Sequence, residues 1–199
     1  GLSAQAWYDA DWPFRQEITL SSTLTASDLS DFPLLVRISG GANPLFAAAQ
    51  TTGQDLLFTA ADGVTKLAHE IEYLETSAGN ERLDAWVKVP TVSSGSDTVL
   101  YVYYGNTTAS DQQQPEAVWD TDFRGVWHLD EQVVDEQTTG LHNDSTSNNQ
   151  DGSQSGNSTE AATGTSIIGP AARLDGDDLI NLDNVVSDDW TGLTQSAWA

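Results

Sequence analysis

Three glutamates in one short stretch are the residues of this chain best placed for acid–base chemistry. They are Glu70, Glu72 and Glu75, within the segment His69-Glu70-Ile71-Glu72-Tyr73-Leu74-Glu75. A retaining glycosidase needs two carboxyl groups about 5–5.5 Å apart. On a regular strand Glu70 and Glu72 share a face and Glu75 points away, so a catalytic pair would require a bulge. The polar face of a half-exposed strand explains this pattern better, and we expect no catalytic residues.

Other common catalytic patterns are absent from the sequence. There is no cysteine, and no serine lies in a Gly-x-Ser-x-Gly segment. The three histidines, His69, His128 and His142, are not spaced as a zinc triad.

Acidic loops are better candidates for a metal, because calcium takes six to eight oxygen ligands and tolerates irregular geometry. One set lies in a loop near the end of the chain: Asp175, Asp177, Asp178, Asn181 and Asp183. A weaker set is Asp144, Asn148 and Asp151. Neither loop matches an EF-hand, and solvated turns remain the alternative, with Gly176 and Gly152 supplying the left-handed conformations.

Two aromatic residues are candidates for ligand binding. Trp86 and Tyr104 are expected on strand faces opposite the core, where their rings could stack on sugars. A contact between sheets or between domains is the alternative role for both. Trp7 and Trp12 are expected to pack near the N-terminus.

The charge excludes two classes of partner. Thirty Asp and Glu face seven Lys and Arg, a formal charge of −23. Such a surface repels nucleic acid and anionic lipid, so we expect neither as a partner. No apolar run approaches the roughly 18 residues of a membrane span, so we expect no membrane insertion. Residues 1–6 end in Ala-x-Ala and resemble the remnant of a signal peptide. We therefore expect export to the cell surface or medium, with the periplasm as an alternative.

Short alternating segments separated by turn residues predict an all-β protein, an antiparallel sandwich of jelly-roll type. In the first part the expected strands are 14–20, 32–38, 55–59, 69–75, 83–89 and 99–104. The last of these is apolar on both faces, as expected for a central strand. On 83–89 we expect Leu83, Ala85, Val87 and Val89 in the core, and Pro90 is expected to end the strand.

The sequence predicts two domains, 7–111 and 119–199, joined by a linker at 112–118. Residues 119–199 are more polar, with strand-like pieces at 123–129, 171–174 and 179–182 and another beginning near 194. This segment has too little apolar material to close a sandwich alone. We expect either that the natural protein continues past Ala199 or that another chain completes the sheet.

The first segment resembles a secreted bacterial and archaeal family known as domain of unknown function 2341. The residues that carry the resemblance are Trp12-Pro13-Phe14-Arg15, Asp31-Phe32-Pro33-Leu34-Leu35-Val36, Gly53-Gln54-Asp55-Leu56-Leu57-Phe58, His69-Glu70-Ile71-Glu72, Ala85-Trp86-Val87-Lys88-Val89-Pro90 and Tyr103-Tyr104-Gly105-Asn106. The resemblance covers residues 7–110 and implies no established activity.

The second segment looks like the N-terminal part of a concanavalin A-like, laminin G-like lectin sandwich. The segments concerned are Gly125-Val126-Trp127-His128-Leu129, residues 144–152, residues 172–180 and Gln195-Ser196-Ala197-Trp198. This resemblance implies glycan or protein recognition, frequently with calcium. The spacing of the three glutamates is also similar to the Glu-x-Asp-x-x-Glu signature of jelly-roll β-glucanases, with Glu72 in place of Asp.

We therefore expect a secreted, non-catalytic binding or adhesion module of a larger protein, recognising a glycan or another cell-surface ligand. Calcium is the only cofactor expected. Three alternatives stay open. They are a structural subunit of an extracellular filament or surface layer, self-assembled through β edges; a jelly-roll glycoside hydrolase; and an exported sensor domain of a biopolymer-transport proton-channel protein.

Overall fold

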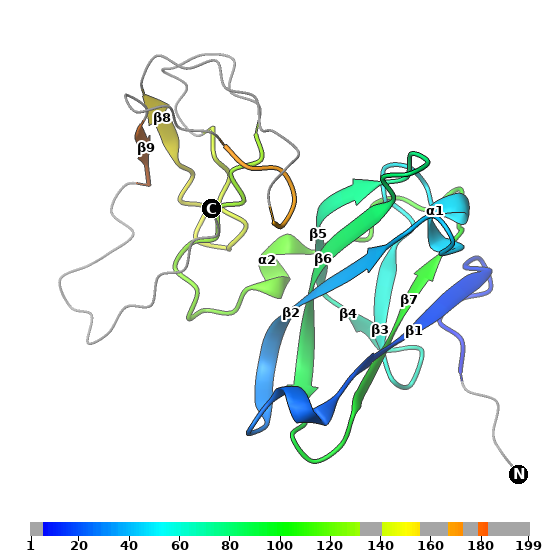
Figure 1. Ribbon diagram of the computed structural model, residues 1–199. Coiled ribbons are helices and arrows are strands. Elements are labelled where there is room, and N and C mark those ends of the chain that lie inside the picture. Colours follow the sequence, from blue (N-terminus) through cyan, green and yellow to red (C-terminus); the bar gives the residue numbers. More distant parts are fainter. Residues whose placement is uncertain (1–5, 132–140, 156–166, 173–178, 183–199) are drawn as a thin grey trace, which may run out of the picture. The chain divides into compact units, whose positions relative to one another are not determined.

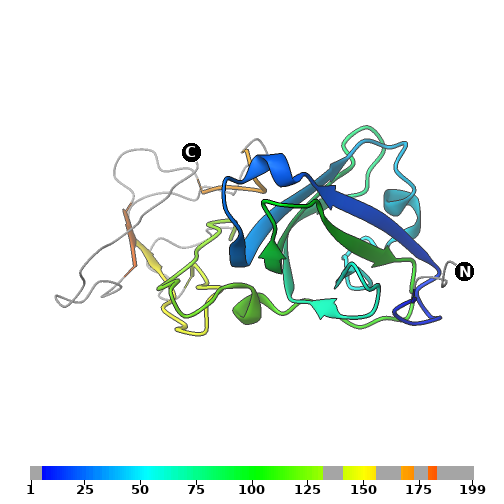
Figure 2. The same cartoon turned by 90° about the horizontal axis from the view of Figure 1, so that it is seen from below.

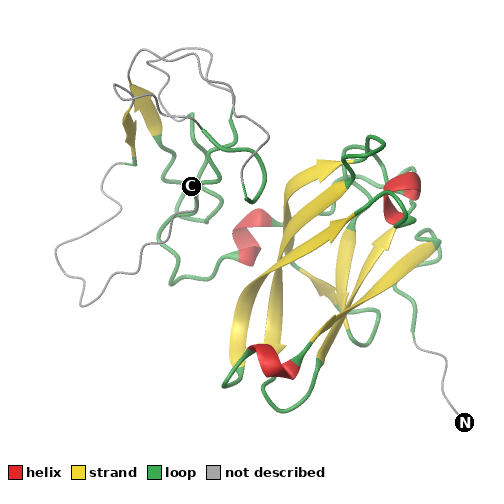
Figure 3. Cartoon of the chain, in the orientation of Figure 1, coloured by secondary structure: helices red, strands yellow, loops and turns green. Residues whose placement is uncertain are grey.

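The computed structural model describes residues 6–131, 141–155, 167–172 and 179–182. The chain divides into two compact units, Gly1–Val118 and Trp119–Ala199. Figure 1 labels the helices and strands, and Figure 3 colours them by type.

The first unit is an antiparallel β-sandwich, which confirms the predicted fold class. One sheet has four strands in the order β1 (Phe14–Leu20), β7 (Thr98–Tyr104), β3 (Leu57–Ala60) and β4 (Lys66–Leu67). The other sheet has three, in the order β2 (Leu29–Ser39), β6 (Arg82–Val92) and β5 (His69–Glu75). The described part of this unit also contains three single-turn helices: the 3-10 turn η1 (Ser22–Leu24), α1 (Leu45–Ala48) and α2 (Pro115–Val118).

The core lies between the two sheets, which pack face to face in Figures 1 and 2. Alternate residues of β6 point into it, as their spacing predicts: Leu83, Ala85, Val87 and Val89. Leu100 and Val102 meet them from β7, the central strand between β1 and β3. The same alternation leaves Asp84, Trp86 and Lys88 on the opposite face of the three-stranded sheet.

Most predicted strands of the first unit are confirmed, with one correction at Pro90. Strand β6 continues past this proline to Val92. The pairing with β2 is interrupted there, because Ser30 pairs with Thr91 and Phe32 with Val89, which leaves out Asp31 and Pro90. Asp31 has a φ of 49°. A proline is tolerated at such an irregularity, since no ladder hydrogen bond is required of its nitrogen. The short strand β4 was not predicted.

In the second unit the structure describes one strand pair, β8 (Ser153–Ser155) with β9 (Leu179–Asn181). The prediction of a strand at 179–182 is confirmed, and β8 was not predicted. The prediction of a strand at 123–129 is wrong, because Trp127 forms only an isolated bridge with Asp144. Residues 171 and 172 are not in a strand, and residues 173–174 and the segment from 194 lie outside the described residues. Among the described residues, no helix is long and apolar enough to span a membrane.

His69 lies in the core of the first unit instead of on a functional surface. Its side chain is fully buried, and its ring centre is 5.2 Å from that of Phe58. Neither ring nitrogen has a hydrogen-bond partner among the described residues. Burial, reinforced by the positive charge of Lys66, lowers the pKa of His69 to about 4.

We predict that His69 makes the fold sensitive to mild acid. The unfolded chain binds a proton at His69 below about pH 6.5, whereas the native state resists protonation until about pH 4. The free energy of unfolding is therefore not reduced by His69 above about pH 6.5, and it falls as the pH drops from there towards 4. His69→Leu should remove about 2.5 kcal/mol of the loss between pH 7 and 4.5. Urea unfolding of both proteins at the two pH values measures it, and equal losses would contradict the prediction.

Candidate functional site

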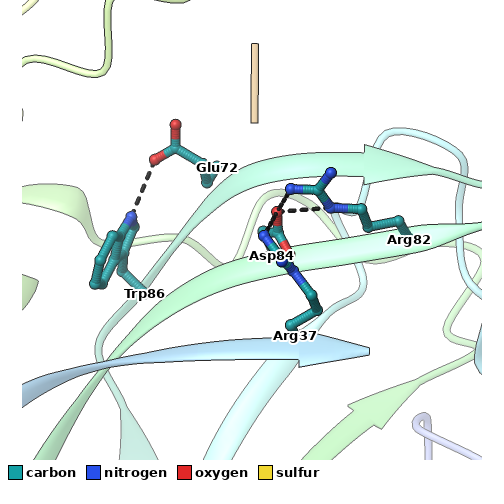
Figure 4. Close-up of polar contacts among 5 residues, drawn as sticks. All are labelled: Arg37, Glu72, Arg82, Asp84 and Trp86. Carbon is teal, nitrogen blue, oxygen red and sulfur yellow. Dashed lines mark hydrogen bonds and ion pairs between the residues drawn. The ribbon is translucent and has the colours of Figure 1, made fainter. Parts of the chain in front are cut away.

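The outward face of the three-stranded sheet gathers charged and aromatic side chains. We call it the outer face and define it by seven residues that alternate with the core: Leu35, Arg37, Glu70, Tyr73, Asp84, Trp86 and Lys88. Cross-strand pairing brings them together, because Arg37 pairs with Asp84 and Glu70 with Trp86. Figure 4 shows the polar contacts among five residues on this side of the sheet.

Asp84 anchors the charges of the outer face. Its side chain is fully buried and lies between two guanidinium groups. Arg37 donates from Nε and Nη2 to the two carboxylate oxygens at 2.6 and 3.0 Å. Arg82 donates to Oδ2 from Nε at 2.8 Å and also from Nη2. Burial alone would raise the pKa of Asp84, but these hydrogen bonds outweigh it and hold the pKa below its usual value.

A bulge in β5 changes which side chains point outward. Ile71 pairs with Ala85, and the next pair is Tyr73 with Asp84, so Glu72 is an extra residue in this strand. After the bulge, Leu74 packs against the core. On a regular strand Tyr73 would lie on the same face as Ile71, but the bulge shifts it by one position to the outer face. There the guanidinium of Arg82 lies 5.3 Å from the Tyr73 ring centre.

The three glutamates therefore lie differently from a regular strand. Glu70 pairs with Trp86, and Glu75 pairs with Arg82. Arg82 lies on the same outward side of β6 as Asp84 and Trp86, because these three residues alternate with the core positions. The expectation that Glu75 points away from Glu70 is wrong for the same reason: the bulge adds one residue between them. Glu75 accepts the backbone N–H of Ser77 at 2.7 Å. Hydrogen bonds from Ser77 lower the pKa of Glu75, which is opposite to what a general acid requires.

The two predicted aromatic ligand-binding residues are not brought together. Trp86 lies on the outer face, half-buried, and its indole Nε1–H donates to Glu72 Oε2 at 3.0 Å. Tyr104 is buried at 3% exposure, belongs to the core cluster and stacks on Phe14 with ring centres 5.6 Å apart. Its predicted place opposite the core is wrong. Both faces of β7 are apolar, so the sequence alone did not reveal which one meets the other sheet.

The predicted metal residues at Asp144, Asn148 and Asp151 form a network that does not fit calcium. Asp144 Oδ1 accepts the backbone N–H groups of Val126 and Thr146, and Oδ2 accepts Thr146 Oγ1–H and the N–H of Gln150, all at 2.9–3.0 Å. Donors therefore occupy the directions that a cation would need.

The other two residues of this set also bind the main chain. Asn148 Nδ2 donates to the carbonyl oxygens of Phe123 and Arg124 at 3.2 Å. Asp151 Oδ1 accepts the N–H of Asp144 at 3.0 Å.

Of the other predicted calcium ligands, Asn181 is an exposed residue of β9. Asp175, Asp177, Asp178 and Asp183 lie outside the described residues. Within the described ranges, no group of three or more His, Cys, Asp or Glu side chains is arranged to hold a metal ion.

Comparison with known families supports part of the predicted resemblance. Residues 52–136 match the family model for a domain of unknown function, DUF2341. The match covers β3 to α2 and four of the six motifs quoted for the resemblance, while the motifs at Trp12 and Asp31 precede it. It also passes residue 118, where the first compact unit ends. No curated protein and no solved structure matches the chain.

Sequence reasoning missed the two arginines that bind Asp84. The sequence does not mark Asp84 as buried, because it alternates with the core positions Leu83 and Ala85 as a solvent-facing residue would. A buried carboxylate needs a cationic partner, but this requirement becomes visible only when the structure shows the burial of Asp84.

We predict that Asp84→Asn destabilises the first unit by about 3 kcal/mol, because two guanidinium groups lose the carboxylate that compensates them. Urea unfolding followed by circular dichroism at pH 7 measures the loss. Asp9→Asn is the matched control. It removes one exposed charge but keeps an acceptor for the N–H of Asp11. A change at Asp84 no larger than that at Asp9 would show that the arginines do not depend on this carboxylate.

Asp144 allows a separate prediction about calcium. Asp144→Asn places an amide N–H₂ among hydrogen-bond donors and should destabilise the second unit by about 2 kcal/mol. Because the loss comes from hydrogen bonds, it should be equal in calcium chloride and in a chelator. Thermal unfolding in both buffers measures it. A calcium-dependent rise in melting temperature that vanishes in the variant would instead identify Asp144 as a calcium ligand.

Proposed function

We propose that this chain is an exported, non-catalytic recognition module of a larger protein and that its outer face binds a glycan. The observation that carries the proposal is the fixed orientation of Trp86. The hydrogen bond to Glu72 holds the indole, and the neighbouring Asp84 ion pairs stiffen the same sheet face. A rigid aromatic ring among polar groups is suited to sugars, because it binds with little loss of side-chain entropy.

The charge of the chain favours an uncharged ligand. With a formal charge of −23, the protein repels polymers rich in sulfate or uronic acid, most strongly at low salt. A neutral polysaccharide escapes this repulsion.

A glycoside hydrolase remains the second candidate, because the bulge places both Glu70 and Glu75 on the outward side of β5. Two observations favour binding over catalysis. The pKa of Glu75 is lowered, whereas catalysis by a protonated acid needs a raised value. Glu72 is engaged by the indole of Trp86.

The filament alternative is less well supported by the edges of the three-stranded sheet. At β5, Gln114 donates its N–H to the carbonyl of His69 at 2.9 Å, and Gln113 Oε1 accepts the N–H of Ile71 at 2.6 Å. At β2, Pro33 lacks a donor and Asp31 has a left-handed conformation. Covered and irregular edges discourage strand pairing between chains.

We predict that Trp86→Ala weakens binding to a neutral β-glucan by roughly tenfold, since one stacked aromatic ring is lost. Affinity electrophoresis in gels containing soluble β-glucan measures it. Tyr73→Phe, which keeps its ring, is the matched control and should bind within about twofold of the native chain. Unchanged retardation of the Trp86→Ala protein, in a gel that retards the native chain, would refute a role for this face.

A reducing-sugar assay on the same glucan separates binding from catalysis. We expect no release of reducing ends by the native chain. Turnover that is abolished in Glu70→Gln would establish the hydrolase instead.

A further inference from the structure

A second aromatic site lies on the other sheet, and the proposed function does not use it. Residues 6–12 form an N-terminal strap along the side of the four-stranded sheet that faces away from the core. Tyr101 and Tyr103 of β7 lie under it, in a cluster separate from the main core. The N–H of Tyr8 donates to Tyr103 Oη at 3.3 Å, and the indole of Trp12 donates to the carbonyl of Asp55 at 2.6 Å.

The position of the strap is set by close main-chain packing. Arg15 Nη1 donates to the carbonyl of Ala6 at 2.8 Å and to Tyr103 Oη at 2.9 Å. Tyr103 Oη in turn donates to the carbonyl of Gly63 at 2.8 Å. A Cβ atom on Gly63, whose φ is +77°, would lie 2.3 Å from the Ala6 oxygen. Only glycine therefore allows the strap this approach.

Trp7 is held on several sides and yet remains exposed. Its Nε1–H donates to the carbonyl of Trp12 at 2.8 Å, and its ring meets Tyr103 edge-on at 5.3 Å. The guanidinium of Arg15 lies between two rings, 4.6 Å from the centre of Trp7 and 4.5 Å from that of Tyr101. Trp7 is nevertheless 41% exposed.

The two tryptophans of the strap thus have different roles. Trp12, 8% exposed, anchors the strap to the sheet. Packing accounts for only part of Trp7, because the exposed 41% of the residue adds no hydrophobic stabilisation. An orientation fixed by a hydrogen bond, an edge contact and a stacked cation is instead what a binding platform requires, since no side-chain freedom remains to be lost.

We propose that Trp7 is a platform for a neutral pyranose chain, independent of the outer face of the three-stranded sheet. The apolar C–H groups on one side of a pyranose ring stack on the indole. Glu17, an exposed carboxylate that accepts Tyr101 Oη–H at 3.0 Å, lies next along β1 on the same side as Arg15 and can accept sugar hydroxyl groups. The net charge of −23 disfavours uronate chains.

The test uses the full chain with 5-fluorotryptophan at its seven tryptophans, followed by fluorine NMR. Trp7→Phe assigns the Trp7 resonance. Cellohexaose, laminarihexaose and xylohexaose are titrated at low salt, with oligoguluronate as the acidic comparison. We expect at least one neutral hexasaccharide to shift the Trp7 resonance, and oligoguluronate to leave it unchanged.

Variants then decide whether Trp7 itself binds. Trp7→Ala should weaken binding at this site roughly tenfold, whereas Trp7→Tyr, which keeps a ring, should lose only a fewfold. Phe14→Ala is the matched control, because Phe14 is 49% exposed and lies one residue from Arg15, on the opposite face of β1. Melting temperatures of all variants check that the strap-bearing unit stays folded.

The proposals for the two sites can be refuted independently of each other. Trp86→Ala should leave the Trp7 shift intact, so loss of glucan retardation by that variant alone concerns only the outer face. A Trp7 resonance unmoved by all three neutral sugars, or Trp7→Ala binding as tightly as the native chain, would overturn the platform. The platform would also be overturned if the Trp7 resonance shifted with protein concentration in the absence of sugar and sedimentation showed dimers. The occupant would then be a second copy of the chain.

Discussion

Burial of one face of β6 against the other sheet is the constraint on which the outer face depends. Leu83, Ala85 and Val87 fill the space between the sheets and are fully buried. Because side chains of a strand alternate, the same packing forces Asp84 and Trp86 to the opposite side. A slip of one residue would move a carboxylate and an indole into the apolar space between the sheets and remove three apolar side chains from it, so the register is strongly specified.

The bulge at Glu72 lets β5 follow this register while presenting a different set of side chains. Before it, Ile71 faces the core opposite Ala85; after it, Leu74 does so opposite Leu83. The extra residue carries the carboxylate that receives the indole N–H of Trp86. Trp86 is therefore oriented by an irregularity in the neighbouring strand, in keeping with the tendency of bulges to re-aim side chains near functional sites.

The sequence was sufficient to predict strands and their core-facing sides where apolar and polar residues alternate strictly, and insufficient where they do not. The strand ending at Glu75 and the inward face of β6 followed from period-two patterns alone. The bulge did not, because it depends on which strand pairs with β5. Tyr104 was assigned to the wrong face, since β7 is apolar on both sides. The arginines of the Asp84 ion pairs come from strand positions whose proximity only the sheet order reveals, and Trp7 becomes notable only once its contacts are known.

The bulge shifts the alternation of side chains in β5 by one residue, and this shift can be measured directly. The chain contains no cysteine, so any introduced thiol is the only one present. Single cysteines at positions 73 and 74 are labelled with a thiol reagent in native buffer, and denatured samples serve as the reference. With a bulge at Glu72, the thiol of Tyr73→Cys reacts rapidly, and that of Leu74→Cys is protected by the core. A regular strand would reverse this order, and rapid labelling at 74 with protection at 73 would contradict the account.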